Sequence, residues 1–223
     1  MKPLQGLYKM ALGGGAIAYS SGMIAEAVLG WKLDPRVTLL SELAANDRPH
    51  RRIFRRADLV AGALFLTAGA VPQPRRANAL RGCLAVFGAA TIADALSPLD
   101  FPISHDSLAP ENILGQEGRS ISHRAHYLTT AVAGGAAAGI CIVDWRARRR
   151  QGSSARQFAG PAIVLGQLAG LIALASPKFL PGLVQRVQTL GFTALCLDLA
   201  RIGIADSSAP PMQADAKSWE SPE

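Results

Sequence analysis

The chain has 223 residues, of which 49% are hydrophobic and 17% are charged. A soluble domain of this size usually has about 25% charged residues, and the charges here fall in blocks between long apolar tracts. This pattern is typical of a polytopic membrane protein. The net charge of +7 would suggest a nucleic-acid partner for a soluble protein, but these arginines border apolar segments. We therefore expect membrane lipids as partners and no nucleic acid.

Six apolar segments follow one another along the chain, and each is near the roughly 20 residues that a helix needs to cross a bilayer. They cover residues 10–29, 53–71, 80–99, 125–143, 158–175 and 180–202. The segments lack the alternating pattern of strands, and in lipid only helices and closed barrels satisfy their backbone groups. The sequence predicts an all-α bundle of about six transmembrane helices. This single domain covers residues 1–205, and a polar, disordered tail covers 206–223.

The connection between the first two segments contains an unusually charged stretch. It reads SELAANDRPHRRIFRRAD, residues 41–58, with five arginines, one histidine and three acids. With the N-terminus inside, 12 lysines and arginines fall on the inner side and 10 on the outer side. Leaving out the first connection changes the split to 12 against 3, as the positive-inside rule requires. We expect both termini to be cytoplasmic and the first connection to form the rim of an outward-facing polar pocket. An inverted topology is the alternative.

Under this topology, most ionisable residues in or beside the apolar segments fall on the outer side. Ionisable residues in membrane segments are expensive to bury and are candidates for function. By contrast, Asp144 and Asp198 fall at the cytoplasmic ends, where we expect nearby arginines to pair with them. The outer group consists of Glu26, Asp58, Asp94, Asp100, His123, His126 and Arg186, with Gln185 and Gln188 beside Arg186.

His123 and His126 are three residues apart and therefore share a helix face. With Asp94, or with Asp100 or Glu42, they could supply three ligands to zinc or another divalent metal. No HExxH motif is present, and a hydrogen-bonded polar cluster explains the same residues without a metal. Arg186 requires a partner in a helix of this kind, and Asp94, Asp58 or a lipid phosphate would serve.

Several segments in order resemble one known family. They are YSS at 19–21, LDP at 33–35, SELAANDRPHRRIFRRADLVAG, DALSPLD, SHRAHYLTT and LVQRVQTLGF. The chain resembles the bacterial membrane family termed domain of unknown function 998, related to the Frag1/DRAM/Sfk1-like six-helix membrane proteins. The resemblance covers about residues 8–203 and implies six helices in a bacterial inner membrane, without an assigned activity. The positions that match the family pattern are Ser41, Glu42, Arg55, Asp58, Asp94, Asp100, His123, His126, Gln185 and Arg186.

Three functions fit these residues. The first is binding of a lipid or small amphiphile with an anionic group, through the ligand-binding candidates Ser41, Glu42, Arg55, Asp58, Asp100, Gln185 and Arg186. The second is a membrane-embedded hydrolase or transferase acting on a lipid-like substrate, with His123, His126 and Asp94 as catalytic or metal-binding residues. The third is a small ion or proton-coupled transporter. The sequence does not determine the oligomeric state.

Overall fold

The computed structural model describes residues 2–102, 104, 120–150, 152 and 158–206. The predicted tail at 206–223 begins one residue too early, because Asp206 belongs to α6; the rest of the tail and most of the third connection lie outside the described residues. The described chain is all-α and has six long helices, as predicted. Three short 3-10 helices lie in the connections: η1 (Leu40–Ala44), η2 (Arg75–Ala77) and η5 (Pro177–Phe179). The long helices are α1 (Lys2–Val28), α2 (Arg51–Ala70), α3 (Asn78–Leu96), α4 (Ile121–Arg150), α5 (Ala159–Ala173) and α6 (Pro181–Asp206).

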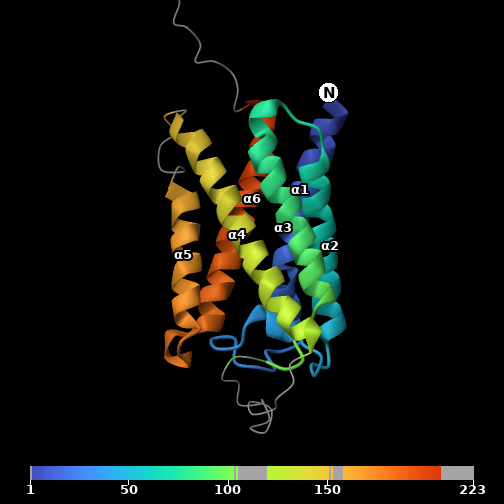
Figure 1. The fold of residues 1–223 in the computed structure, drawn as a ribbon, viewed down its shortest axis with the longest axis vertical. Coiled ribbons are helices and arrows are strands. Elements are labelled where there is room, and N and C mark those ends of the chain that lie inside the picture. The colour runs from blue at the N-terminus through green and yellow to red at the C-terminus, as the bar shows by residue number, and fades with distance from the viewer. Residues whose placement is uncertain (1, 103, 105–119, 151, 153–157, 207–223) are drawn as a thin grey trace, which may run out of the picture.

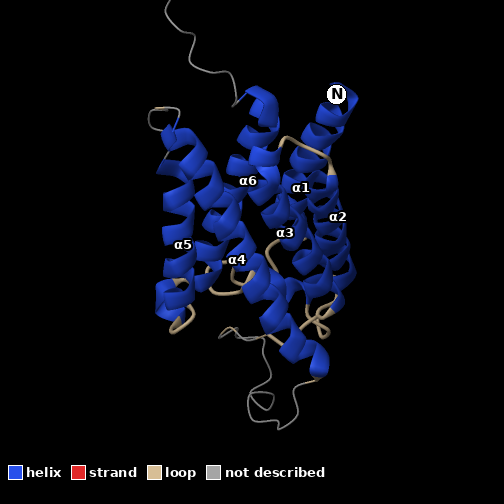
Figure 2. Cartoon of the chain, turned by 45° about the horizontal axis from the view of Figure 1, so that its top comes forward, coloured by secondary structure: helices blue, strands red, loops and turns tan. Residues whose placement is uncertain are grey.

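The helices run up and down alternately and form a closed ring. Each helix packs on the next one in the chain, and α6 packs on α1. Figure 1 shows the N-terminus at one end of the bundle and the connections after α1, α3 and α5 at the other. Figure 2 shows that helices make up nearly all of the described chain. We call the end opposite the N-terminus the distal end.

The centre of the bundle is apolar and aromatic. Tyr19, Phe65, Phe87 and Phe192 come from α1, α2, α3 and α6, and their ring centroids lie 4.8–6.4 Å apart. Several of these contacts are edge-to-face, the arrangement that aromatic quadrupoles favour. This cluster joins four helices and stabilises their closed arrangement halfway along the bundle.

Glycines allow α2 and α3 to approach closely. A Cβ on Gly69 would lie 2.6 Å from the backbone nitrogen of Ala85, and one on Gly88 would lie 2.6 Å from the carbonyl oxygen of Gly62. No real side chain tolerates such contacts, so the two backbones meet only because these positions have no Cβ. Small residues bring membrane helices together in the same way.

Two of the described helices, α3 and α4, are long and apolar enough to cross a membrane. Helix α5 is apolar but shorter, at 15 residues, or about 22 Å. The helices begin and end within a few residues of the predicted segments, except that α1 begins at Lys2 and α4 extends in both directions to Ile121 and Arg150.

Candidate functional site

The candidate residues predicted to share the outer side lie together at the distal end of the bundle. This follows from the alternating helices, because α1 and α3 end there and α2, α4 and α6 begin there. The first connection, residues 29–50, and the start of the third connection close this end. At the opposite end, the predicted pairing of Asp144 and Asp198 with a nearby arginine is confirmed: Arg148 lies 2.8 Å from Asp144 and 2.9 Å from Asp198.

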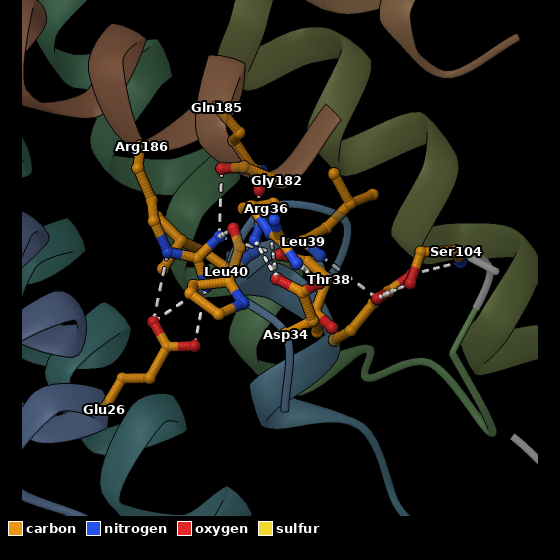
Figure 3. A network of polar contacts seen from close by, with 12 residues as sticks. Glu26, Asp34, Arg36, Thr38, Leu39, Leu40, Ser104, Gly182, Gln185 and Arg186 are labelled. Atoms are coloured by element: carbon orange, nitrogen blue, oxygen red, sulfur yellow. Dashed lines mark hydrogen bonds and ion pairs between the residues drawn. The ribbon is translucent and has the colours of Figure 1, made fainter. Parts of the chain in front are cut away.

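Arg186, near the start of α6, is the centre of the polar network in Figure 3. Its Nη2 donates to both carboxylate oxygens of Glu26 at 2.7 Å, and its Nε donates to one of them at 3.1 Å. Its Nη1 donates to the carbonyl oxygens of Pro35 at 2.7 Å, Thr38 at 2.7 Å and Gly182 at 2.9 Å. Both side chains are buried. The partner of Arg186 is therefore Glu26 from α1, rather than the Asp58 or Asp94 suggested by the sequence.

The first connection is also fastened to α6 through its backbone. The side-chain oxygen of Gln185 accepts the Leu40 N–H at 2.6 Å, and the Arg36 carbonyl accepts the Leu183 N–H at 3.1 Å. Gly182 permits this contact, since a Cβ there would lie 2.6 Å from the Pro35 carbonyl oxygen. Gln185, a predicted ligand-binding residue, thus positions the connection.

Glu42 links the first and third connections. Its side chain is fully buried and accepts hydrogen bonds from the Leu39 N–H at 3.1 Å and from the Ser104 backbone and hydroxyl, each at 2.5 Å. Ser41 lies half-buried beside it in η1. These contacts place a buried carboxylate where three donors compensate its desolvation.

Arg55 joins the first connection to α2. Its Nε donates to the Ala44 carbonyl at 2.8 Å, and its Nη2 donates to the Asn46 side chain at 2.9 Å. The Asn46 N–H in turn donates to the Leu99 carbonyl at 2.8 Å. Arg55 therefore orders the connection that surrounds the distal end.

His123 is fully buried and belongs to a group with Asp100. Its Nδ1 accepts the Asp100 N–H at 3.1 Å, so the other ring nitrogen carries the proton and donates to the Tyr127 hydroxyl at 3.1 Å. The Asp100 carboxylate accepts from the Ser120 N–H and hydroxyl, each at 2.9 Å. Burial raises the pKa of Asp100, but the hydrogen bonds from Ser120 outweigh it and hold the pKa below its usual value.

His126 pairs with Asp94. The two side chains lie 3.2 Å apart, and the same ring nitrogen lies 3.1 Å from the Ser97 carbonyl. Because both neighbours are acceptors, this Nδ1 carries the proton and Nε2 is left as the basic nitrogen. Asp94 also accepts from the hydroxyls of Thr129 at 2.6 Å and Thr130 at 2.8 Å.

The two histidines therefore have different partners. The predicted ligands His123, His126 and Asp94 do not form a metal-binding group, and among the described residues no cluster of three or more His, Cys, Asp or Glu side chains is placed to hold a metal ion. Asp58 lies half-buried in α2, near enough to Asp94 to interact with it electrostatically.

A cavity of about 140 Å³ opens beside this network, between the end of α1, the first connection and the start of α2. Its walls are mostly apolar, and Phe54, Leu43, Leu29 and Leu33 belong to one hydrophobic cluster. Of the polar residues predicted to share this end of the bundle, only Glu26 lines the cavity, and none of the predicted ligand-binding residues does. The lining residues are Glu26, Leu29, Lys32, Leu33, Leu43, Arg48, Pro49, His50 and Phe54.

Comparison with family models gives one match, which covers residues 12–201 and is described as a protein of unknown function, DUF998. The chain belongs to the DUF998 family. The resemblance to domain of unknown function 998 inferred from the sequence is thus confirmed. No curated protein and no solved structure matches the chain.

Sequence reasoning found most of the polar residues but not the cavity. Lys32, Arg48 and His50 were not singled out from the other charges of the first connection. The signal that could have marked their segment is the set of apolar residues close to those charges in the sequence, Leu29, Leu33, Leu43 and Phe54. In a solvated loop these side chains would have no partners, so their presence indicates a loop folded onto a hydrophobic cluster.

Proposed function

We propose that this DUF998 protein is a multi-pass membrane protein that binds an amphiphile with an anionic group in the distal cavity. The observation that carries the proposal is the cavity itself, which combines apolar walls with Lys32, Arg48 and His50 at one place. Binding sites for small molecules commonly have this composition, with mostly apolar walls and a few polar groups that orient the ligand.

The outer surface supports membrane insertion of all six helices. Each helix exposes large apolar side chains, whereas soluble monomers rarely expose large apolar patches. On α5, Leu165 is 65% exposed and Leu171 is 66% exposed. The exposed apolar residues include Ile17 and Ile24 of α1, Val60 and Leu66 of α2, Val86 and Leu96 of α3, Leu128 and Val132 of α4, Leu165, Leu168 and Leu171 of α5, and Val187 and Leu190 of α6.

The charges around the cavity favour an anion. Glu26 lines it, but this carboxylate is neutralised by its ion pair with Arg186. Lys32 is exposed at the edge, while Arg48 is buried and its Nε lies 3.8 Å from Asp47. Because the donors of Arg186 are already directed at protein acceptors and Arg48 is ion-paired with Asp47, we assign the contact with the anionic group to Lys32.

The volume of the distal cavity limits the size of the ligand. A cavity of about 140 Å³ is close to the roughly 150 Å³ cavity that admits benzene. It therefore accepts a small amphiphile, or a segment of one acyl chain, rather than a whole phospholipid. With both termini cytoplasmic, this ligand would enter from the outer leaflet.

Fluorescence quenching tests the proposal, with Trp31 kept as the single tryptophan beside Lys32. We expect 11-bromoundecanoate to quench Trp31 in nanodiscs more strongly than the uncharged 11-bromoundecanol. Lys32→Gln should weaken the carboxylate's apparent affinity by about tenfold, the value of one hydrogen bond to a charged group. Arg52→Gln is the matched control, since Arg52 is exposed and does not line the cavity. Equal quenching by acid and alcohol, or equal effects of both substitutions, would argue against the site.

The Asp94–His126 pair favours hydrolysis of a lipid-like substrate as a second candidate function. A carboxylate that holds Nδ1–H and leaves Nε2 basic is the arrangement of a general base. If the protein is a hydrolase, purified protein should release fatty acid from fluorescent acyl lipids, and His126→Gln should abolish release while leaving 11-bromoundecanoate binding intact. Release that continues in His126→Gln would exclude this residue as the base.

A further inference from the structure

The end of α4 carries a second charged surface, at the opposite end of the bundle from the cavity. Trp145, Arg146, Arg149 and Arg150 line a hollow of about 540 Å³ there. The guanidinium carbon of Arg149 lies 5.6 Å from the centre of the Trp145 ring, within the range of a cation–π contact. We call these four residues the α4 basic surface.

The arginines of this surface differ from their neighbour Arg148. Arg148 is buried and ion-paired with Asp144 and Asp198. Arg146, Arg149 and Arg150 are exposed, and within the described part of the chain none of the three forms an ion pair. Arg146 is three and four residues from the other two, so the three guanidinium groups can converge on one face of the helix. They present a positive charge that no acidic side chain among the described residues neutralises.

We propose that the α4 basic surface binds the phosphate of an anionic phospholipid headgroup. Guanidinium groups match phosphate geometry and bind it through paired hydrogen bonds. The negative end of the helix dipole also favours cations in the last turn, but it explains neither the hollow nor the tryptophan beside it.

The position along α4 fits a headgroup. Ile142 is still an exposed apolar residue, Trp145 follows one turn later, and Arg149 follows about one turn after that. This order, from apolar side chain to tryptophan to arginine, matches the passage from acyl chains through the interface to the headgroups. Basic surfaces on the cytoplasmic side attract anionic lipids in the same way. The inference rests on the membrane placement proposed above, but not on the distal cavity.

Trp145 provides the probe, in protein whose other tryptophans are replaced by phenylalanine. In nanodiscs, phosphatidylglycerol with brominated acyl chains should quench Trp145 more strongly than brominated phosphatidylcholine at the same mole fraction. Each arginine is expected to contribute about fivefold to the enrichment of anionic lipid. The triple variant Arg146→Gln/Arg149→Gln/Arg150→Gln should therefore lose the preference for phosphatidylglycerol. Arg52→Gln/Arg56→Gln, which removes two exposed arginines at the distal end, should keep it.

Three results would overturn the proposal: equal quenching by the two lipids, a preference that survives the triple variant, or a preference that inorganic phosphate removes. The last result would show that a soluble phosphate group occupies the site instead of a lipid. Circular dichroism confirms that the variants are folded, and Arg149→Gln alone replaces the triple variant if that protein does not fold. If the protein does not bind 11-bromoundecanoate but still prefers phosphatidylglycerol, the proposed amphiphile site in the distal cavity is wrong and the lipid site on the α4 basic surface stands.

Discussion

Arg186 directs all three of its guanidinium nitrogens at other parts of the chain, and it joins α1, α6 and the first connection. The sequence indicated that this arginine needs a partner and that Glu26 lies on the same side of the bundle. It did not select Glu26 over Asp58 or Asp94, because that choice depends on which helices are neighbours. The contact of α6 with α1, which closes the ring, decides the pairing.

Replacing either member of this pair should destabilise the protein strongly. In Glu26→Gln or Arg186→Gln, one buried charge remains without its counter-ion, and we expect a loss of about 3 kcal/mol or more in the free energy of unfolding. Arg36→Gln is the control, because Arg36 pairs with Asp34 at an exposed position and should change stability by less than about 1 kcal/mol. Unfolding titrations in mixed micelles measure both. Similar losses for the two pairs would contradict the central role of Arg186.

The Asp100 carboxylate should make the stability of the folded protein depend on pH in the acid range. Its folded pKa is lowered, so its contribution is fully present above the ordinary aspartate pKa and is lost as the pH falls through the folded value. Asp100→Asn removes this dependence. The midpoint of thermal unfolding, measured from neutral to acid pH, should therefore fall less steeply in Asp100→Asn than in the unmodified protein. Parallel curves for the two proteins would show that Asp100 does not contribute.

At the scale of helices, the apolar pattern predicted the order and number of the elements well, but not all of their ends. Helix α4 begins at Ile121 and ends at Arg150, and it therefore extends beyond the apolar stretch at both ends. The polar residues at its ends continue the helical backbone, which the apolar pattern does not reveal. The close packing of α2 on α3 was also missed. Its glycines, Gly62, Gly69 and Gly88, lie seven or more residues apart within a helix or on different helices, and they do not form the four-residue spacing that marks such contacts.

Gly88→Ala tests this packing. Its methyl group would overlap the Gly62 carbonyl oxygen, and we expect a loss of about 1–3 kcal/mol in the free energy of unfolding, as for other overpacked cores. Gly82→Ala is the matched control on the same helix, where a Cβ would meet nothing within 4 Å. If the two substitutions have equal effects on thermal unfolding, helix propensity rather than packing controls this interface.

For the molecule as a whole, alternating helices bring residues from distant parts of the sequence to one end. The sequence predicted this grouping because it follows from the number of helices alone. The cavity could not be predicted in the same way, since it depends on how the first connection folds back onto Phe54 and Leu29. The charges of this connection are therefore only part of its role, and its buried apolar residues form the cavity wall.

Cysteine labelling in intact cells tests the orientation of the bundle. In a variant with the native cysteines replaced by alanine, Asn46→Cys in the first connection should react with a membrane-impermeant maleimide. Gln73→Cys, between α2 and α3, should react only after the cells are permeabilised. The reverse pattern would place the distal end in the cytoplasm and would contradict an outward-facing cavity.

Photocrosslinking with an anionic amphiphile tests the central claim most directly. A fatty acid with a diazirine near the end of its chain would be bound to the protein in nanodiscs, irradiated and mapped by mass spectrometry. The account predicts labels on Leu29, Leu33, Leu43 and Phe54, reduced by Lys32→Gln and by an excess of unlabelled fatty acid. Labels confined to outward-facing residues such as Leu165, Leu168 and Val187, insensitive to both, would show that the cavity does not bind the amphiphile.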